Sequence, residues 1–195
     1  YPLTLIGNRD EFHHRPTRPA QPWQEEGMPE LLAGKDLEAG GTWLGVTRSG
    51  RFAALTNIRS PGAIRGPLSR GKLVLDYLAG TDTAADYLSQ LSEKSADFAG
   101  FNLLVGDRHR LWYLNSQEGQ PRELLPGVYG LSNAALNTPW PKLTQLREQL
   151  TAMPQAAPEQ LLHLLHDEHI YADELLPQTG VNSDLERMLS ACFII

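Results

Sequence analysis

Residues 42–57, TWLGVTRSGRFAALTN, decide the fold class of this chain. The two halves of the stretch, residues 42–47 and 51–57, carry the β-branched and aromatic residues that favour strands. Between them stands Arg48-Ser49-Gly50, where the glycine suits a turn that needs a positive φ. The stretch therefore predicts two antiparallel strands joined by a short turn.

Further segments of the chain have strand character. Residues 101–106 and 111–114 predict a second hairpin, which turns at Asp107-Arg108-His109. Residues 3–6 and 127–131 predict single short strands. Residues 13–41 hold prolines at 16, 19, 22 and 29 together with several charges, which predicts an extended segment along the surface.

Helical patterns lie between and after these strands. Apolar residues recur at helical spacing in five segments, namely residues 68–78, 84–94, 141–150, 158–166 and 184–190. Pro141 suits the first turn of its helix, because that turn does not need the missing N–H. The order of elements predicts an α+β fold, with antiparallel sheets layered with helices, in a single domain over residues 1–195.

Composition narrows the class of protein. The 195 residues are 41% hydrophobic and 21% charged, as in ordinary globular proteins, and the net charge of -6 argues against nucleic acid or an acidic membrane as the main partner. No apolar run approaches the roughly 20 residues of a membrane span. The single cysteine, Cys192, excludes an intrachain disulfide, so we expect a cytoplasmic protein.

The two ends of the sequence lack ordinary boundaries. The chain begins at Tyr1-Pro2 without a methionine and enters an apolar run at once. It stops within residues 191–195, a β-branched and aromatic run that no turn residue ends and that has strand character. We therefore expect a chain truncated at both ends.

Three histidines, His163, His166 and His169, recur at steps of three on a predicted helix. This spacing places their side chains close enough for a metal site, but it also fits a solvated face opposite a leucine stripe. The second interpretation is favoured because no zinc signature spacing is present. We therefore predict no metal site.

The glycines Gly40 and Gly41 open the first predicted hairpin. They do not form a phosphate loop, since no Lys-Ser/Thr follows and the next element is a strand. Two interpretations remain: a tight entry to a closely packed strand, or the wall of a ligand pocket.

Short polar residues follow three of the predicted strands. Asp10, Asn57 and Asn133 each come directly after an apolar run, and Arg9 precedes the first of them. If the strands are neighbours, these side chains meet at one edge of the sheet, where amide groups can stabilise an oxyanion. The alternative, which the residues by themselves favour, is that Asn and Asp are good turn residues.

A family resemblance shifts this balance. The motifs Asn8-Arg9-Asp10-Glu11, AGKDLEAGGTWLG at residues 33–45 and FAALTN at residues 52–57, with LSN at 131–133 and LSACF at 189–193, closely resemble the NRDE family, also called the Transport and Golgi organisation protein 2 family. The resemblance covers essentially the whole chain. That family is similar to N-terminal-nucleophile hydrolases, so the resemblance implies an αββα sandwich.

The choloylglycine hydrolase branch of those enzymes offers a comparison by residue. Asp10 matches the aspartate that holds the nucleophile's α-amine, and Asn57, followed by Pro61-Gly62, and Asn133 match the two oxyanion donors. Gly7 stands where the enzymes have an arginine, which leaves Arg9 as a displaced candidate. The nucleophilic cysteine and a late arginine would both fall outside residues 1–195.

Two functions follow from the resemblance. The favoured one is intracellular handling or mobilisation of haem, or of another large amphipathic ligand such as an acyl compound, with no cofactor required. The alternative is an amidohydrolase or thioesterase whose N-terminal cysteine lies before residue 1; a structural interaction protein is a third option. The candidate ligand contacts are Asn8, Arg9, Trp23, Gly40, Gly41, Trp43, Arg59 and Trp140.

Overall fold

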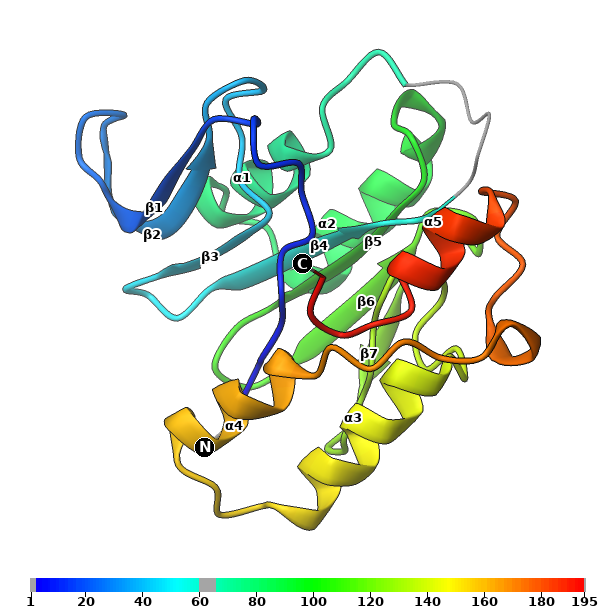
Figure 1. Ribbon diagram of the computed structural model, residues 1–195. Coiled ribbons are helices and arrows are strands. Elements are labelled where there is room, and N and C mark those ends of the chain that lie inside the picture. Colours follow the sequence, from blue (N-terminus) through cyan, green and yellow to red (C-terminus); the bar gives the residue numbers. More distant parts are fainter. Residues whose placement is uncertain (1–2, 60–65, 195) are drawn as a thin grey trace. The chain divides into compact units, whose positions relative to one another are not determined.

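The computed structural model describes residues 3–59 and 66–194, which divide into two compact units (Figure 1). The sheet unit comprises residues 12–58 and 66–126, and the helical unit comprises residues 3–11, 59 and 127–194. The described residues contain seven strands and five α-helices, which confirms the α+β class. No helix among them is long and apolar enough to cross a membrane.

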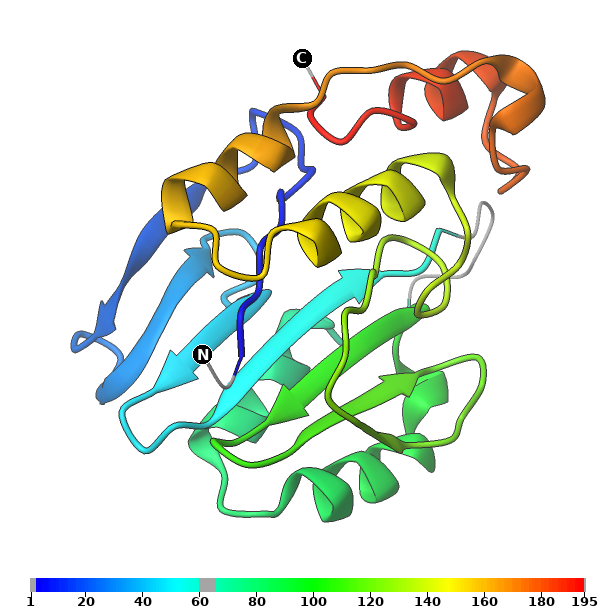
Figure 2. The same ribbon diagram turned by 90° about the horizontal axis from the view of Figure 1, so that it is seen from below.

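The sheet unit is built on one antiparallel sheet in which every strand pairs with the next along the chain (Figure 2). Its strands are β1 (Thr17–Trp23), β2 (Met28–Asp36), β3 (Leu44–Thr47), β4 (Phe52–Asn57), β5 (Phe101–Gly106), β6 (Leu111–Asn115) and β7 (Arg122–Leu124). The hairpins β3–β4 and β5–β6 confirm the two predicted hairpins. Gly50 adopts the positive φ that the first turn was expected to need.

Two helices, α1 (Gly71–Ala79) and α2 (Ala84–Ser92), cover one face of this sheet, as predicted from their leucine spacing (Figure 2). Leu73, Val74 and Leu88 point from them into the core, against Leu103 and Val105 of β5. Burial of these apolar side chains is the main stabilising contribution to the unit.

The opposite face of the sheet carries a buried polar network on β4, β5 and β6. Asn102 is fully buried, and its Oδ1 accepts hydrogen bonds from Tyr113 Oη at 2.6 Å and Asn115 Nδ2 at 2.9 Å. Its Nδ2 donates to Thr56 Oγ1 at 3.2 Å. Buried polar groups need such partners, so Asn102 joins the neighbouring strands β4, β5 and β6.

The extended segment predicted over residues 13–41 is wrong, because β1 and β2 form a hairpin there. Prolines remove ladder hydrogen bonds, but β1 is an edge strand with irregular register, where prolines are tolerated. Trp23 ends β1 with 1% of its surface exposed, and its Nε1 donates to the Ala33 carbonyl of β2 at 3.0 Å. Trp23 is therefore a core residue of the hairpin.

Three short predicted strands are wrong: residues 3–6, 127–131 and 191–194 form no strand, while residue 195 lies outside the described residues. Residues 127–131 pack on a helix, since Gly130 lacks the Cβ that would meet Leu143, and Arg147 Nη2 donates to the Val128 carbonyl at 3.3 Å. The carbonyls of Ala191 and Cys192 accept from side chains, so they form no strand ladder.

The helical unit contains α3 (Pro141–Ala152), α4 (Pro158–His163) and α5 (Ser183–Met188), with 3-10 turns at Leu164–His166 and Asp173–Leu175. These helices confirm the three predicted from residues 141–150, 158–166 and 184–190, with α5 shorter than expected. Pro141 stands in the first turn of α3, as expected, and Asn182 caps α5 by accepting from Leu185 N at 2.8 Å.

Candidate functional site

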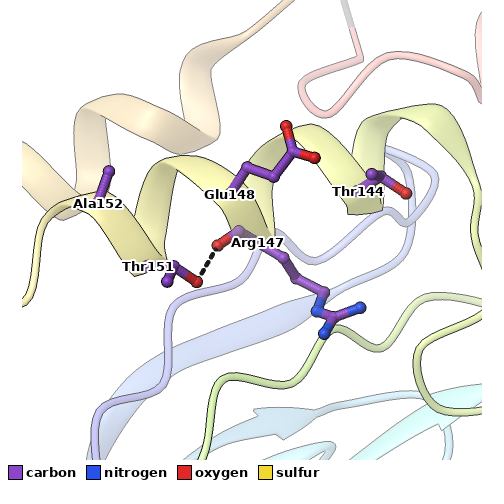
Figure 3. Close-up of a pocket in the computed structure, with 5 residues that line it drawn as sticks. All are labelled: Thr144, Arg147, Glu148, Thr151 and Ala152. Carbon is purple, nitrogen blue, oxygen red and sulfur yellow. Dashed lines mark hydrogen bonds between the residues drawn. The ribbon is translucent and has the colours of Figure 1, made fainter.

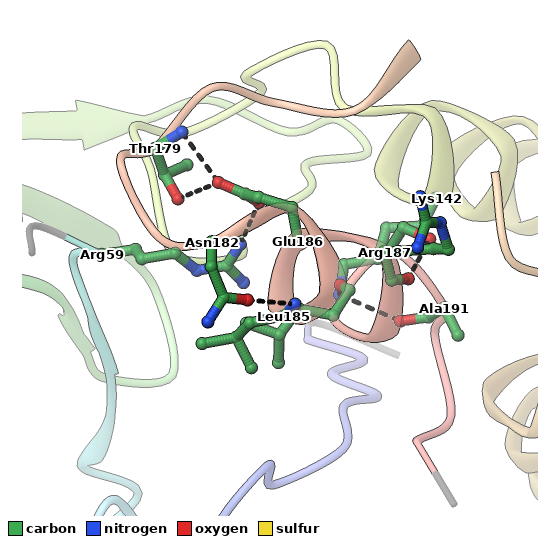
Figure 4. A network of polar contacts seen from close by, with 10 residues as sticks. Arg59, Lys142, Thr179, Asn182, Leu185, Glu186, Arg187 and Ala191 are labelled. Carbon is green, nitrogen blue, oxygen red and sulfur yellow. Dashed lines mark hydrogen bonds and ion pairs between the residues drawn. The ribbon is translucent and has the colours of Figure 1, made fainter. Parts of the chain in front are cut away.

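Charged side chains from distant parts of the chain meet inside the helical unit. Arg59 Nη1 lies 2.9 Å from Glu186 Oε2 of α5, and the two side chains are 11% and 6% exposed (Figure 4). The other carboxylate oxygen of Glu186 accepts from the backbone N–H and the hydroxyl of Thr179. The Arg59 guanidinium also lies over the Trp140 ring, 5.2 Å from its centroid. This is a desolvated ion pair in which both oxygens of the carboxylate are bonded.

Lys142 forms the second cationic centre, in the first turn of α3. Its Nζ donates to the carbonyls of Leu189 at 2.8 Å and Ala191 at 3.0 Å, so it holds the chain that follows α5 (Figure 4). Burial lowers the pKa of Lys142, whereas the Asp10 carboxylate raises it and the Arg59 charge lowers it further. We call Asp10, Arg59, Lys142, Glu186 and Cys192 the Arg59–Lys142 cluster.

Cys192 is the thiol of this cluster and is about half-buried. Burial raises its pKa above the ordinary value of 9.0, and the carboxylates of Asp167 and Asp10 act in the same direction. The Lys142 ammonium lowers it, but by less than burial raises it. Because the thiolate is the nucleophile, the environment of Cys192 suppresses its reactivity.

Alkylation of Cys192 tests this arrangement. We expect iodoacetamide to react more slowly at pH 8 with the folded chain than with the chain in urea, since the raised pKa reduces the thiolate fraction. Lys142→Met should slow alkylation further, because the charge that lowers the thiol pKa is lost. The matched control is Lys72→Met on α1, in the sheet unit. Faster alkylation in Lys142→Met would contradict the account.

Asn8 fastens two segments of the helical unit. Its Nδ2 donates to the carbonyls of Leu165 and Cys192, both at 2.8 Å. The donor capacity of the amide is thereby used on backbone, which makes Asn8 a structural tie in this state. Arg9 makes a long ion pair with Glu11, 3.8 Å between Nη2 and Oε2.

Four of the residues singled out in the sequence meet in the helical unit. The Asp10 carboxylate acts electrostatically on Arg59, and the Arg59 backbone N–H donates to the Asn133 carbonyl at 2.7 Å. Trp140 lies beneath the Arg59 guanidinium. Desolvation lowers the pKa of Arg59, while the charges of Glu186 and Asp10 raise it.

Asn57 belongs to the sheet unit, at the end of β4. Its convergence with Asp10 and Asn133 on one pocket therefore stays a prediction. Pro61-Gly62, the dipeptide that supported its assignment as an oxyanion donor, lies outside the described residues.

Comparison with known protein sequences shows the family to which this chain belongs. The sequence model of the family described as Transport and Golgi organisation 2 matches residues 1–195. The chain belongs to the Transport and Golgi organisation 2 family. It is 43% identical to the Bos taurus Transport and Golgi organization protein 2 homolog over 152 residues, which cover 73% of this chain and 54% of the relative.

Two further mammalian relatives match this chain with similar identity. The Mus musculus homolog is 38% identical over 185 residues, covering 86% of this chain and 66% of the relative. The Homo sapiens homolog is 39% identical over 174 residues, covering 83% and 62%. The chain thus spans between about half and two-thirds of the length of these relatives.

Gly34 and Gly41 pack closely on their neighbours in the sheet unit, whereas Gly40 provides a backbone turn. A Cβ on Gly41 would lie 2.7 Å from the Gly71 backbone at the start of α1. Gly40 adopts a φ of +75°, which side chains rarely adopt. Trp43 packs on Gly34, where a Cβ would lie 2.8 Å from the indole. These contacts fit the tight-entry interpretation of the glycines.

Residues of α3 line a hollow of about 430 Å³ (Figure 3). Five residues of that helix line it: Thr144, Arg147, Glu148, Thr151 and Ala152. The Thr151 hydroxyl donates to the Arg147 carbonyl at 2.7 Å. The hollow follows a single helix, and none of the site residues predicted from the sequence lines it.

Lys142 and Glu186 are the cluster members that sequence reasoning missed. Lys142 did carry a signal, because a cation in the first turn of a helix opposes the helix dipole and needs another reason to be there. Glu186 carried none, since an acidic residue on a short helix is ordinary. Its partner Arg59 is 127 residues away in the sequence.

Proposed function

We propose that this member of the Transport and Golgi organisation 2 family handles a large amphipathic ligand, without chemistry by its own thiol. The proposal rests on the family match over residues 1–195, because the resemblance to that family implies ligand handling. Burial of Cys192, which raises the pKa of its thiol, opposes nucleophilic use of that residue. Arg59 and Lys142 are each bonded to protein oxygens, so these two cations hold the helical unit in shape.

Haem is the ligand that the family resemblance implies, and acyl compounds are the alternative of the same amphipathic character. Haem would be the cargo of this protein, so the proposal requires no resident cofactor. A cytoplasmic location and a small-molecule partner in place of nucleic acid belong to the same proposal, which the acidic net charge of -6 supports.

We further propose the αββα sandwich of N-terminal-nucleophile hydrolases as the complete scaffold. Helices cover one face of the sheet, and the other face carries exposed Leu32 and Val46, paired across β2 and β3 and 44% and 39% exposed. Apolar side chains on a sheet face favour packing against a second layer. A second antiparallel sheet on that face would produce the sandwich.

The second candidate is an amidohydrolase or thioesterase, and the position of Asp10 favours it. A carboxylate close to the charges of both Arg59 and Lys142 is suited to hold an α-amine beside them. Asn57 and Asn133 would then bind the oxyanion. Haem titration of the protein beside an amidase and thioesterase screen separates the two: a haem spectrum without turnover supports the carrier, and turnover lost in a Cys→Ala variant of the N-terminal nucleophile supports the enzyme.

The variant Arg9→Ala distinguishes a ligand-binding role of Arg9 from a structural role in its ion pair with Glu11. If Arg9 pairs with a carboxylate of the ligand, haem affinity should fall about ten- to a hundred-fold, the loss of one charge-assisted contact. Absorbance titration measures this affinity, and a melting curve on the same preparation measures stability. Arg48→Ala is the matched control, because Arg48 makes a similarly long ion pair with Glu30 at 3.6 Å in the sheet unit. Unchanged affinity with a lowered melting temperature would assign Arg9 to the contact with Glu11.

A further inference from the structure

Two histidines of the helical unit, His163 and His166, have exposed imidazoles that face solvent. His163 is the last residue of α4, and His166 lies in the 3-10 turn that follows it; both are exposed. Their ring centroids are 6.4 Å apart. Within residues 3–59 and 66–194, neither imidazole makes a hydrogen bond or an ion pair. Their ring nitrogens are therefore available to a ligand.

An aromatic side chain fixes one of these imidazoles. Phe193 stacks on His166 with centroids 5.4 Å apart and an interplanar angle of 30°. The backbone under Phe193 is itself held, since its N–H donates to the Asp167 carbonyl at 2.8 Å and Asn8 binds the preceding carbonyl. The pair is thus a tethered aromatic surface and not a chance contact of two mobile side chains.

Exposed apolar surface adjoins this pair. Leu162 is exposed and stands four residues before His166, a spacing that places side chains on the same side of a helical segment. Phe193 is also partly open to solvent. The surface formed by Leu162, His163, His166 and Phe193, here called the His–Phe platform, combines metal-binding nitrogens with apolar and aromatic contacts.

The platform has too few ligands for a bare metal ion. Structural and catalytic zinc sites take three or four protein ligands, and no group of three His, Cys, Asp or Glu able to hold a metal occurs in the described part of the chain. Two imidazoles suit a metal that brings its own equatorial ligands. Iron porphyrin is such a ligand, because a single axial imidazole completes its attachment to protein.

We propose that the His–Phe platform is an iron-porphyrin site in which His166 is the axial ligand. The inference rests on the proposed function and assigns the site at which haem would bind. An axial imidazole stands edge-on to the macrocycle, so Phe193, nearly parallel to His166, meets the same face edge-on, a favoured aromatic geometry. Leu162 covers a further part of the porphyrin, and His163 lies beside the ligating ring.

Haemin titration of the purified chain, followed by absorbance, tests the site. We expect a saturable shift of the Soret band in the unaltered chain and an affinity at least about tenfold lower in His163→Ala/His166→Ala, since metal-ligand shells carry effects of this order. His109→Ala, an exposed histidine in the β5–β6 turn, should bind like the unaltered chain. Added imidazole should restore the axial-ligand spectrum to His166→Gly.

The outcomes separate this inference from the proposed function. Haem binding by the unaltered chain with no loss in the double variant would overturn the His–Phe platform and leave the carrier proposal standing. No haem binding by the unaltered chain would overturn the His–Phe platform and the choice of haem as the ligand of the carrier. Binding of Ni²⁺ alone, abolished in the double variant while haemin does not bind, would overturn the porphyrin assignment in favour of a two-histidine ion site. Circular dichroism checks that each variant is folded.

Discussion

Glu186→Gln should lower the free energy of unfolding by about 3 kcal/mol or more, the usual cost of leaving one member of a buried ion pair unpaired. Arg59 would keep its charge, since guanidinium groups do not deprotonate in proteins, while losing the carboxylate 2.9 Å away. Desolvation already lowers the pKa of Arg59, and the Glu186 charge is the first of the interactions that oppose this. Urea denaturation followed by tryptophan fluorescence measures the loss, with Trp140 beside Arg59 as a local reporter.

Arg187→Ala is the matched control for this prediction. Arg187 pairs with Asp173 at 2.7 Å, but both side chains are exposed, so we expect a much smaller loss of stability than for Glu186→Gln. If Glu186→Gln and Arg187→Ala had equal effects, the Arg59–Glu186 pair would not be the desolvated centre of the helical unit.

Asn102→Ala should produce a loss of similar size in the sheet unit, about 3 kcal/mol, since each buried polar group left without its partner costs about 1–3 kcal/mol. The substitution leaves the Tyr113 hydroxyl and the Asn115 amide without their acceptor, and it removes the donor to Thr56. Denaturation followed by circular dichroism measures the loss for the sheet.

Asn182→Ala is the comparison, because it also removes an asparagine amide that caps one N–H, but at an exposed position. Its cost should be near 1 kcal/mol, the usual value for an N-cap. A double-mutant cycle that combines Asn102→Ala with Tyr113→Phe should show coupling between these two residues, because they share a hydrogen bond. Additive effects on the free energy of unfolding would contradict a shared network.

Local sequence patterns predicted the elements whose causes are local. The β3–β4 and β5–β6 hairpins have strand composition beside short turns, and the five α-helices have their apolar spacing. The β1–β2 hairpin was missed because its prolines argue against strands unless the strand is known to lie at an edge. Residues 191–194 have strand composition, but side chains of Asn8 and Lys142 take their carbonyls.

Some residues of the candidate site could be predicted from the sequence, and others could not. Asp10, Arg59, Asn133 and Trp140 could be singled out from motif position and residue type, and they lie together in the helical unit. Glu186 could not, because only the fold brings it to Arg59. The availability of His163 and His166 also depends on three dimensions, since sequence alone does not show whether an imidazole has a partner.

Haemin titration of the unaltered chain, with absorbance and a turnover assay on the same preparation, tests ligand handling most directly. The account predicts a saturable spectral change with one haem per chain and no hydrolysis of amide or thioester substrates. A spectrum that only scales with added haemin, or hydrolysis that proceeds without haem binding, would contradict it.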